Sequence, residues 1–70
     1  MYQVGQVVNI GYYGGFRNQT LIKTQAEITM VDERVAGTWI KAKVVLSPGV
    51  YKTMFGYASD LRQLEENYKK

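Results

Sequence analysis

The sequence predicts an all-β, or mainly β, domain in which five short strands form a small closed or nearly closed barrel. Apolar and polar residues alternate between Thr38 and Val44, and successive side chains of a β-strand point to opposite faces. Turn-forming residues separate four or five such segments within only 70 residues. Closure of so small a sheet would remove edges that otherwise invite aggregation, which favours a barrel.

The first half of the chain predicts two strands joined by a glycine-rich loop. Residues 4–10 are mostly apolar and form the first strand, in which Gly5 allows a bulge or bend. Residues 11–19 hold three glycines and three aromatic residues, a composition expected of a loop that needs a free backbone. Residues 20–31 are β-prone, with Ala26, Ile28 and Met30 alternating with Glu27 and Thr29.

Tight turns are expected between the later strands. Residues 32–37 predict a hairpin connection in which Gly37 adopts a positive φ. The strand at residues 39–46 ends at Ser47-Pro48-Gly49, where proline presets the first central position of a turn and glycine accepts positive φ at the second. A fourth strand follows at residues 51–57. Its pattern leaves open which side is buried, that of Tyr51, Thr53 and Phe55 or that of Lys52, Met54 and Gly56.

The tail changes from a strand period to a helical one. Leu61, Leu64 and Tyr68 lie three and four residues apart, and Ser59 or Asp60 is suited to cap the start of a helix. We expect a short helix from Asp60 to about Tyr68. A single 3₁₀ turn followed by a strand is the alternative.

We interpret residues 1–70 as a single domain. Its composition excludes several kinds of catalytic and metal-binding site. With no cysteine and no histidine, the chain can form no disulfide, no thiolate zinc site and no Cys/His or Ser/His nucleophile. None of the six carboxylates is paired in an evident apolar pocket that would shift its pKa. We therefore expect no enzyme, no metal and no cofactor.

The charge balance favours an anionic partner. The net charge is +3 and the isoelectric point is about 9.3, which suits nucleic acid, an acidic protein surface or anionic lipid. No apolar run approaches the roughly 18 residues that span a bilayer, and the N-terminus lacks the basic and apolar regions of a signal peptide. A cytoplasmic protein without membrane contact is expected.

Residues 27–65 resemble an SH3-like small β-barrel at the level of pattern. The resemblance covers a second strand, an acidic connecting loop, a third strand that opens with tryptophan, and a Gly-Tyr strand end before a 3₁₀ turn. The segments that carry it are Glu27–Val31, Asp32–Gly37, Trp39–Ala42 and Phe55–Leu61. It implies the five-stranded barrel. The first loop holds Arg17 and lacks the acidic residues with which SH3 domains bind proline-rich peptides, so that ligand is not implied.

A weaker resemblance is to the small basic chromatin proteins of archaea, which are also SH3-like. Trp39, Lys41 and Lys43, together with the tail at residues 61–70, are similar to the sheet face and C-terminal helix of those proteins. This resemblance implies DNA binding through the sheet face. The plasmid-type dihydrofolate reductases also use a short SH3-like barrel, but their Val-Gln-Ile-Tyr strand has no match in the Met54–Tyr57 segment.

The first functional hypothesis is low-specificity nucleic-acid binding. Lysines neutralise phosphates, and an aromatic ring stacks on a base or wedges between bases. The residues expected to carry it are Trp39, Lys41, Lys43, Lys52 and Arg17. The structural alternative is that Trp39 covers the edge of the barrel while the lysines only make the strand soluble.

The second hypothesis is a protein-binding adaptor or inhibitor, an accessory protein of a bacterium, phage or plasmid. Aromatic residues in a glycine-rich loop offer rigid contact area at low entropic cost. The residues expected to carry it are Tyr12, Tyr13, Phe16, Trp39 and Tyr57. The structural alternative is that one or two of these rings cap the barrel end, whereas a cluster of Tyr13, Trp39 and Tyr57 would mark an SH3-type peptide groove. A homo-oligomer is compatible with both hypotheses.

Overall fold

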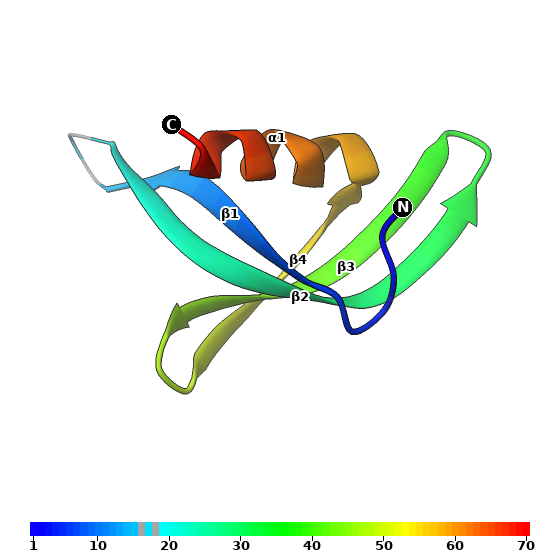
Figure 1. Cartoon of the computed structure of the whole chain (residues 1–70), viewed down its shortest axis with the longest axis horizontal. Helices are drawn as coiled ribbons and strands as arrows, with labels where there is room; N and C mark the ends of the chain where they lie inside the picture. The colour runs from blue at the N-terminus through cyan, green and yellow to red at the C-terminus, as the bar shows by residue number, and fades with distance from the viewer. Residues whose placement is uncertain (16, 18) are drawn as a thin grey trace.

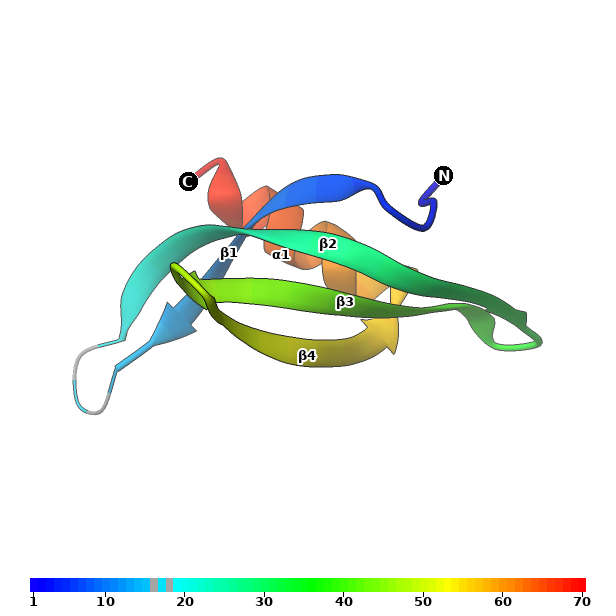
Figure 2. The same ribbon diagram turned by 90° about the horizontal axis from the view of Figure 1, so that it is seen from below.

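Antiparallel strands and a C-terminal helix make up the fold in the computed structural model, which describes residues 1–15, 17 and 19–70 (Figure 1). All strands lie in one sheet of order β1-β2-β3-β4, so each strand pairs with its neighbours in sequence. The sheet is strongly twisted, and the helix lies across one of its faces (Figures 1 and 2). The elements are β1 (Val7–Gly14), β2 (Thr20–Arg34), β3 (Gly37–Ser47), β4 (Val50–Tyr57) and α1 (Ala58–Tyr68).

The sheet is open and has four strands, so the expectation of a closed or nearly closed barrel of five strands is not met. Within the described part of the chain, β1 and β4 form the two edges of the sheet and no pairing joins them. The tail forms the expected helix, α1, and not the alternative of a 3₁₀ turn followed by a strand, because its apolar residues follow the helical period and are buried against the sheet. The structure confirms the SH3-like resemblance only in its broad outline: the chain is small and mainly β, with four antiparallel strands and a C-terminal helix.

Both predicted hairpin turns are confirmed. Arg34 pairs with Gly37, which has a φ of 137°, and β2 extends three residues further than its pattern indicated. Ser47 pairs with Val50 around Pro48-Gly49, where the φ of Gly49 is 77°. Both turns could be predicted from nearby residues alone, because the positive φ that each turn needs is best accepted by glycine.

The first strand lies later in the chain than its pattern predicted. Residues 4 and 5 form a turn, and β1 continues through Gly14 rather than ending at Ile10. Residues 11–14 therefore belong to a strand and not to the loop expected there. They pair with residues 20–23 at the start of β2, and this cross-strand pairing outweighs the low β-propensity of glycine.

The core lies between the sheet and α1 and is built from alternate strand positions. Ile40, Ala42 and Val44 are buried, as the alternation in β3 predicted. Met54 and Gly56 face the same side of β4, which leaves Tyr51, Thr53 and Phe55 on the opposite face. The complete set of buried apolar residues is Val8, Ile10, Ala26, Ile28, Ile40, Ala42, Val44 and Leu61.

Met30 departs from the alternation that predicted it beside Ile28. The pairing register shifts between Ile28 and Met30, so Met30 pairs with Lys41 and lies 36% exposed on the face away from the core. Thr29 is the extra residue of this bulge, and its hydroxyl donates to the Lys41 carbonyl at 3.1 Å. A β-bulge of one residue reverses the face of every side chain that follows it.

The helix begins before the residues expected to cap it. Tyr57 is the N-cap, and its N–H donates to the Asp60 carboxylate at 3.0 Å, so Asp60 caps from the third helical position. Leu61 and Leu64 face the sheet. The next buried residue of the helix is Asn67 and not Tyr68. The Asn67 side-chain amide donates to the Gly11 carbonyl at 3.2 Å.

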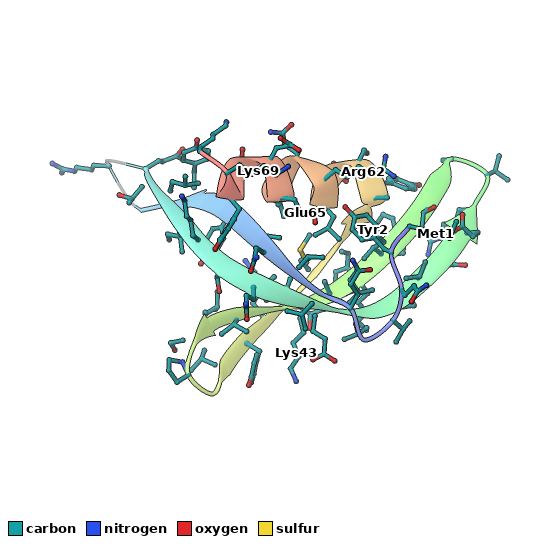
Figure 3. The ribbon with its side chains drawn as sticks, viewed as in Figure 1. Met1, Tyr2, Lys43, Arg62, Glu65 and Lys69 are labelled. Atoms are coloured by element: carbon teal, nitrogen blue, oxygen red, sulfur yellow. The ribbon has the colours of Figure 1, made fainter. Side chains whose placement is uncertain are left out.

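The N-terminal residues pack against the helix. Gly5 N–H donates to the Ile28 carbonyl at 2.7 Å, so the segment that precedes β1 also lies alongside β2. The Tyr2 hydroxyl then donates to the Glu65 carboxylate, which it meets at the surface of α1 (Figure 3). Burial, followed by the hydrogen bond to Glu65 and the charge of Glu65, raises the pKa of Tyr2 to about 12.

Candidate nucleic-acid interface

The sheet face turned away from α1 carries aromatic and basic side chains in a regular array. Pairing register explains the array, because residues directly opposite in an antiparallel pair project from the same face. Trp39 pairs with Tyr57 and Lys41 with Phe55. We call this surface the aromatic–basic face and define it by Arg34 of β2, by Trp39, Lys41 and Lys43 of β3, and by Tyr51, Phe55 and Tyr57 of β4.

Cations and rings contact one another along this face. The Lys41 ammonium lies 5.4 Å from the centre of the Phe55 ring, and the Lys43 ammonium lies 4.4 Å from that of Tyr51. Phe55 and Tyr51 are 58% and 52% exposed. Two large exposed rings, each with an ammonium group beside it, offer both stacking area and positive charge to one ligand.

Trp39 is half-buried and held by contacts on two sides. The Arg34 guanidinium lies 4.7 Å from the centre of the indole, and Tyr57 meets the indole edge to face with ring centres 5.1 Å apart. Asp32 in turn forms an ion pair with Arg34 at 3.0 Å. Trp39 is thus oriented at one end of the aromatic–basic face and leaves part of its indole in contact with solvent.

Lys41 and Lys43 supply positive charge on the face that is not engaged in ion pairs among the described residues. Lys43 pairs across the sheet with Glu27, but neither Lys41 nor Lys43 forms an ion pair with any residue that the structure describes. Lys43 projects from the side of the sheet opposite to α1 (Figure 3). Both ammonium groups are therefore available to phosphates, whereas Arg34 is already paired with Asp32.

The other two residues predicted for nucleic-acid binding lie elsewhere. Lys52 pairs with Val44, a core residue, so it projects from the face that carries α1. Arg17 is exposed in the loop between β1 and β2, outside the array. The period of two within β4 already separates Lys52 from Tyr51 and Phe55. Sequence reasoning missed Tyr51, Phe55 and Arg34 for this surface, because their place beside β3 depends on the pairing register.

The residues predicted for protein binding do not form one cluster. Trp39 and Tyr57 are in contact, but Tyr57 precedes the N-terminus of α1 while Tyr13 lies near its C-terminal end, with the Lys70 ammonium 5.9 Å from its ring. Tyr12 is half-buried against the core. Phe16 lies outside the described residues. Tyr13, Trp39 and Tyr57 therefore do not form the cluster that would have marked an SH3-type peptide groove.

An apolar groove lies on the opposite side of the sheet, between α1 and the hairpin of β3 and β4. Its volume is about 420 Å³. Six apolar or aromatic residues line it with one ammonium group: Ile10, Tyr12, Val44, Leu46, Met54 and Leu64, with Lys52.

The described residues contain no group of three or more histidine, cysteine, aspartate or glutamate side chains that could hold a metal ion. No helix among them has the length and apolar character that crossing a membrane requires.

The aromatic–basic face must be interpreted from its own geometry. Comparison of the chain with protein-family models, with curated proteins and with solved structures finds no match.

Proposed function

We propose that this chain is a non-enzymatic binding protein that takes nucleic acid onto its aromatic–basic face with low sequence specificity. One observation carries the proposal: on one sheet face the ammonium groups of Lys41 and Lys43 each lie beside an exposed ring, that of Phe55 and that of Tyr51. Phosphates need cations and unstacked bases need rings, and this face supplies both within a few ångströms.

Single strands suit the face better than duplexes. The rings of Tyr51 and Phe55 stand four residues apart on one strand, a separation of about 13 Å, so two bases can stack on separate rings. Bases are available for stacking only when they are not already paired and stacked within a duplex. A duplex would contact the lysines through its phosphates and gain little from the rings.

The contacts between lysines and rings do not block the face. An exposed cation–π contact contributes about 0.5–1 kcal/mol, whereas stacking of one base on an aromatic ring contributes about 1–3 kcal/mol. A base can therefore replace the ammonium over the ring, and the displaced ammonium then pairs with the adjacent phosphate. We expect Lys41 and Lys43 to move by side-chain rotation alone, without change in the sheet.

Lys41→Ala and Lys43→Ala test the electrostatic part of this proposal. Each substitution should weaken binding and reduce the slope of log affinity against log salt by about 0.7, because one phosphate contact is lost. Labelled single- and double-stranded oligonucleotides titrated at several salt concentrations measure both quantities. Emission of Trp39, the only tryptophan, reports whether the ligand lies on this face.

Lys52→Ala is the matched control, since it removes the same charge from the opposite face of the sheet. It should change the affinity and the salt slope much less than Lys43→Ala. Equal losses from the two variants would show that only net charge matters and would contradict the proposed face. A titration that stays silent at low salt would instead favour a protein partner.

Phe55→Ala tests the stacking part. Loss of one ring should lower affinity for a single strand by about 1–3 kcal/mol while affecting duplex affinity less. Val35→Ala removes an exposed apolar side chain at the tip of the β2–β3 turn, outside the residues that define the face, and should change neither affinity. Equal effects of Phe55→Ala on single strands and duplexes would argue against base stacking.

A further inference from the structure

The two edges of the sheet differ in whether another element covers them. The β1 edge is covered by α1: Asn67 donates to the Gly11 carbonyl, and a Cβ placed on Gly11 would lie 2.9 Å from the main chain of Asn67 and Tyr68. Beyond β4, in contrast, no described strand pairs, and Figure 2 shows β4 as the outermost strand on its side. An exposed strand edge is a template for pairing with another chain unless it is blunted.

The composition of β4 contains few of the residues that prevent an edge strand from pairing with another chain. Its eight residues hold no proline and a single charge, that of Lys52, while Val50, Tyr51 and Phe55 are at least half exposed. The single charged side chain projects from the helix face of the sheet. β4 thus combines free backbone groups with exposed apolar side chains, a combination that monomeric sheets avoid.

The molecule also exposes more surface than a compact chain of its mass. Its accessible area is 4992 Å², whereas a monomer of 8.0 kDa is expected to expose about 4,450 Å². Its radius of gyration is 12.2 Å against about 11 Å expected for 70 residues. Exposed apolar side chains of the hairpin of β3 and β4 contribute to this area, namely those of Leu46, Val50, Tyr51 and Phe55.

From these observations we propose that β4 pairs with β4 of a second copy, antiparallel and across a two-fold axis at Thr53. Residues directly opposite in an antiparallel pair share a face, so matching the two faces of both sheets requires one residue of β4 to lie opposite its own copy. The choice of register therefore reduces to the choice of that central residue.

The side chains of β4 favour Thr53 at the centre. In this register Tyr51 lies opposite Phe55 of the second copy, and the symmetry gives two such aromatic pairs on the outer face. Lys52 lies opposite Met54 of the second copy, so the two ammonium groups are kept apart. A centre at Lys52 would place these like charges directly opposite one another, and a centre at Met54 would place Phe55 opposite threonine.

Pairing in this register makes one eight-stranded sheet from two copies. The aromatic–basic faces then form a continuous surface, because Tyr51 and Phe55 of each copy meet at the junction. The inference rests on the β4 edge and holds whether or not that surface binds nucleic acid.

Single cysteines test the register, since the chain has none of its own. Under mild oxidation a mixture of Tyr51→Cys and Phe55→Cys should give a disulfide-linked heterodimer, because these positions are directly opposite. Neither variant should cross-link with itself, since equivalent residues are then about 13 Å apart along the strand, beyond the span of a disulfide. Thr53→Cys should cross-link with itself. Lys43→Cys, one strand away from the edge, should remain uncross-linked and serves as the control.

Sedimentation equilibrium tests the assembly without any cross-link. The unmodified chain should reach twice its 8.0 kDa mass at submillimolar concentration, and Thr53→Lys should remain a monomer because like charges then meet at the axis. Gln25→Lys adds the same charge to an exposed position of β2 and should still dimerise. An unmodified chain that stays monomeric would overturn the proposal, as would a dimer in which neither the cysteine mixture nor Thr53→Cys cross-links.

Discussion

The orientation and exposure of Trp39 are set by its neighbouring side chains. Its indole is neither a core residue nor a free ring, because Arg34 covers one face and Tyr57 meets the ring from the side. Asp32 fixes the guanidinium in turn. An oriented, partly exposed indole loses little side-chain freedom on binding, which makes it a suitable end point for a ligand that also contacts Lys41 and Lys43.

Folding changes the titration of Tyr2. Its pKa is raised to about 12 by burial and by the carboxylate of Glu65, so the folded chain holds the phenolic proton more tightly than the unfolded chain, in which the pKa is about 10. The stabilisation is complete below about pH 10 and is lost as the pH rises to about 12. Denaturant unfolding at a series of pH values should show this decline.

Tyr2→Phe isolates that contribution. It removes the hydroxyl and leaves the ring, so at neutral pH it should lower the free energy of unfolding by about 1 kcal/mol. The difference between the original chain and the variant should then shrink between about pH 10 and 12, because the variant has no proton to lose at this site. A difference that stays constant through this range would show that the Tyr2–Glu65 hydrogen bond does not stabilise the fold.

At the scale of elements, the contact between α1 and β1 takes the place of barrel closure. The helix approaches the strand most closely at Gly11, where a methyl group would lie 2.9 Å from helix main chain that cannot give way as a side-chain end can. Gly11→Ala should therefore push α1 from the edge and lower the free energy of unfolding by about 1–3 kcal/mol. Chemical denaturation monitored by circular dichroism measures this loss.

Gly14→Ala is the matched control within the same strand. A methyl group there would lie 2.9 Å from Ile22 Cδ1, the flexible end of a side chain that is itself partly exposed. This substitution should cost much less than Gly11→Ala. Equal costs would mean that loss of glycine, and not the approach of the helix, determines the effect at Gly11.

Local patterns predicted the parts of the fold that depend on local physics. The alternation in β3 predicted both of its faces, because the period of two is a property of a single strand. The turns at Gly37 and Pro48-Gly49 were predictable because their backbone geometry requires those residue types. The helical spacing of Leu61 and Leu64 likewise predicted α1 against the alternative of a final strand.

Features that depend on distant residues were not predictable in the same way. Met30 lies on the outer face because of a bulge that the sequence does not mark. The position of Phe55 beside Lys41 requires the register between β3 and β4, and the open sheet follows from where α1 packs. The expected barrel and the expected grouping of Lys52 with Trp39 both failed at this level of pairing and packing.

At the scale of the whole molecule, the two faces of one sheet serve different purposes. One face packs seven buried apolar residues against Leu61 of the helix, and the other leaves the rings of Tyr51 and Phe55 at least half exposed. So small a core gives a chain of this length little reserve of stability. Pairing of β4 with a second copy would add to that reserve while leaving the rings of the aromatic–basic face accessible.

This coupling of assembly to stability predicts a melting temperature that rises with protein concentration. For a folded dimer that unfolds to two chains, mass action adds about 1.4 kcal/mol per dimer for each tenfold rise in concentration. In a chain of this size that corresponds to an increase of roughly 3–6 °C in Tm. Calorimetry over a hundredfold range of concentration measures the shift, and Thr53→Lys should melt at a constant temperature because it cannot form the pair. If Thr53→Lys shows the same shift, the dimer forms through a surface other than β4; if the unmodified chain shows none, its fold is complete without a partner.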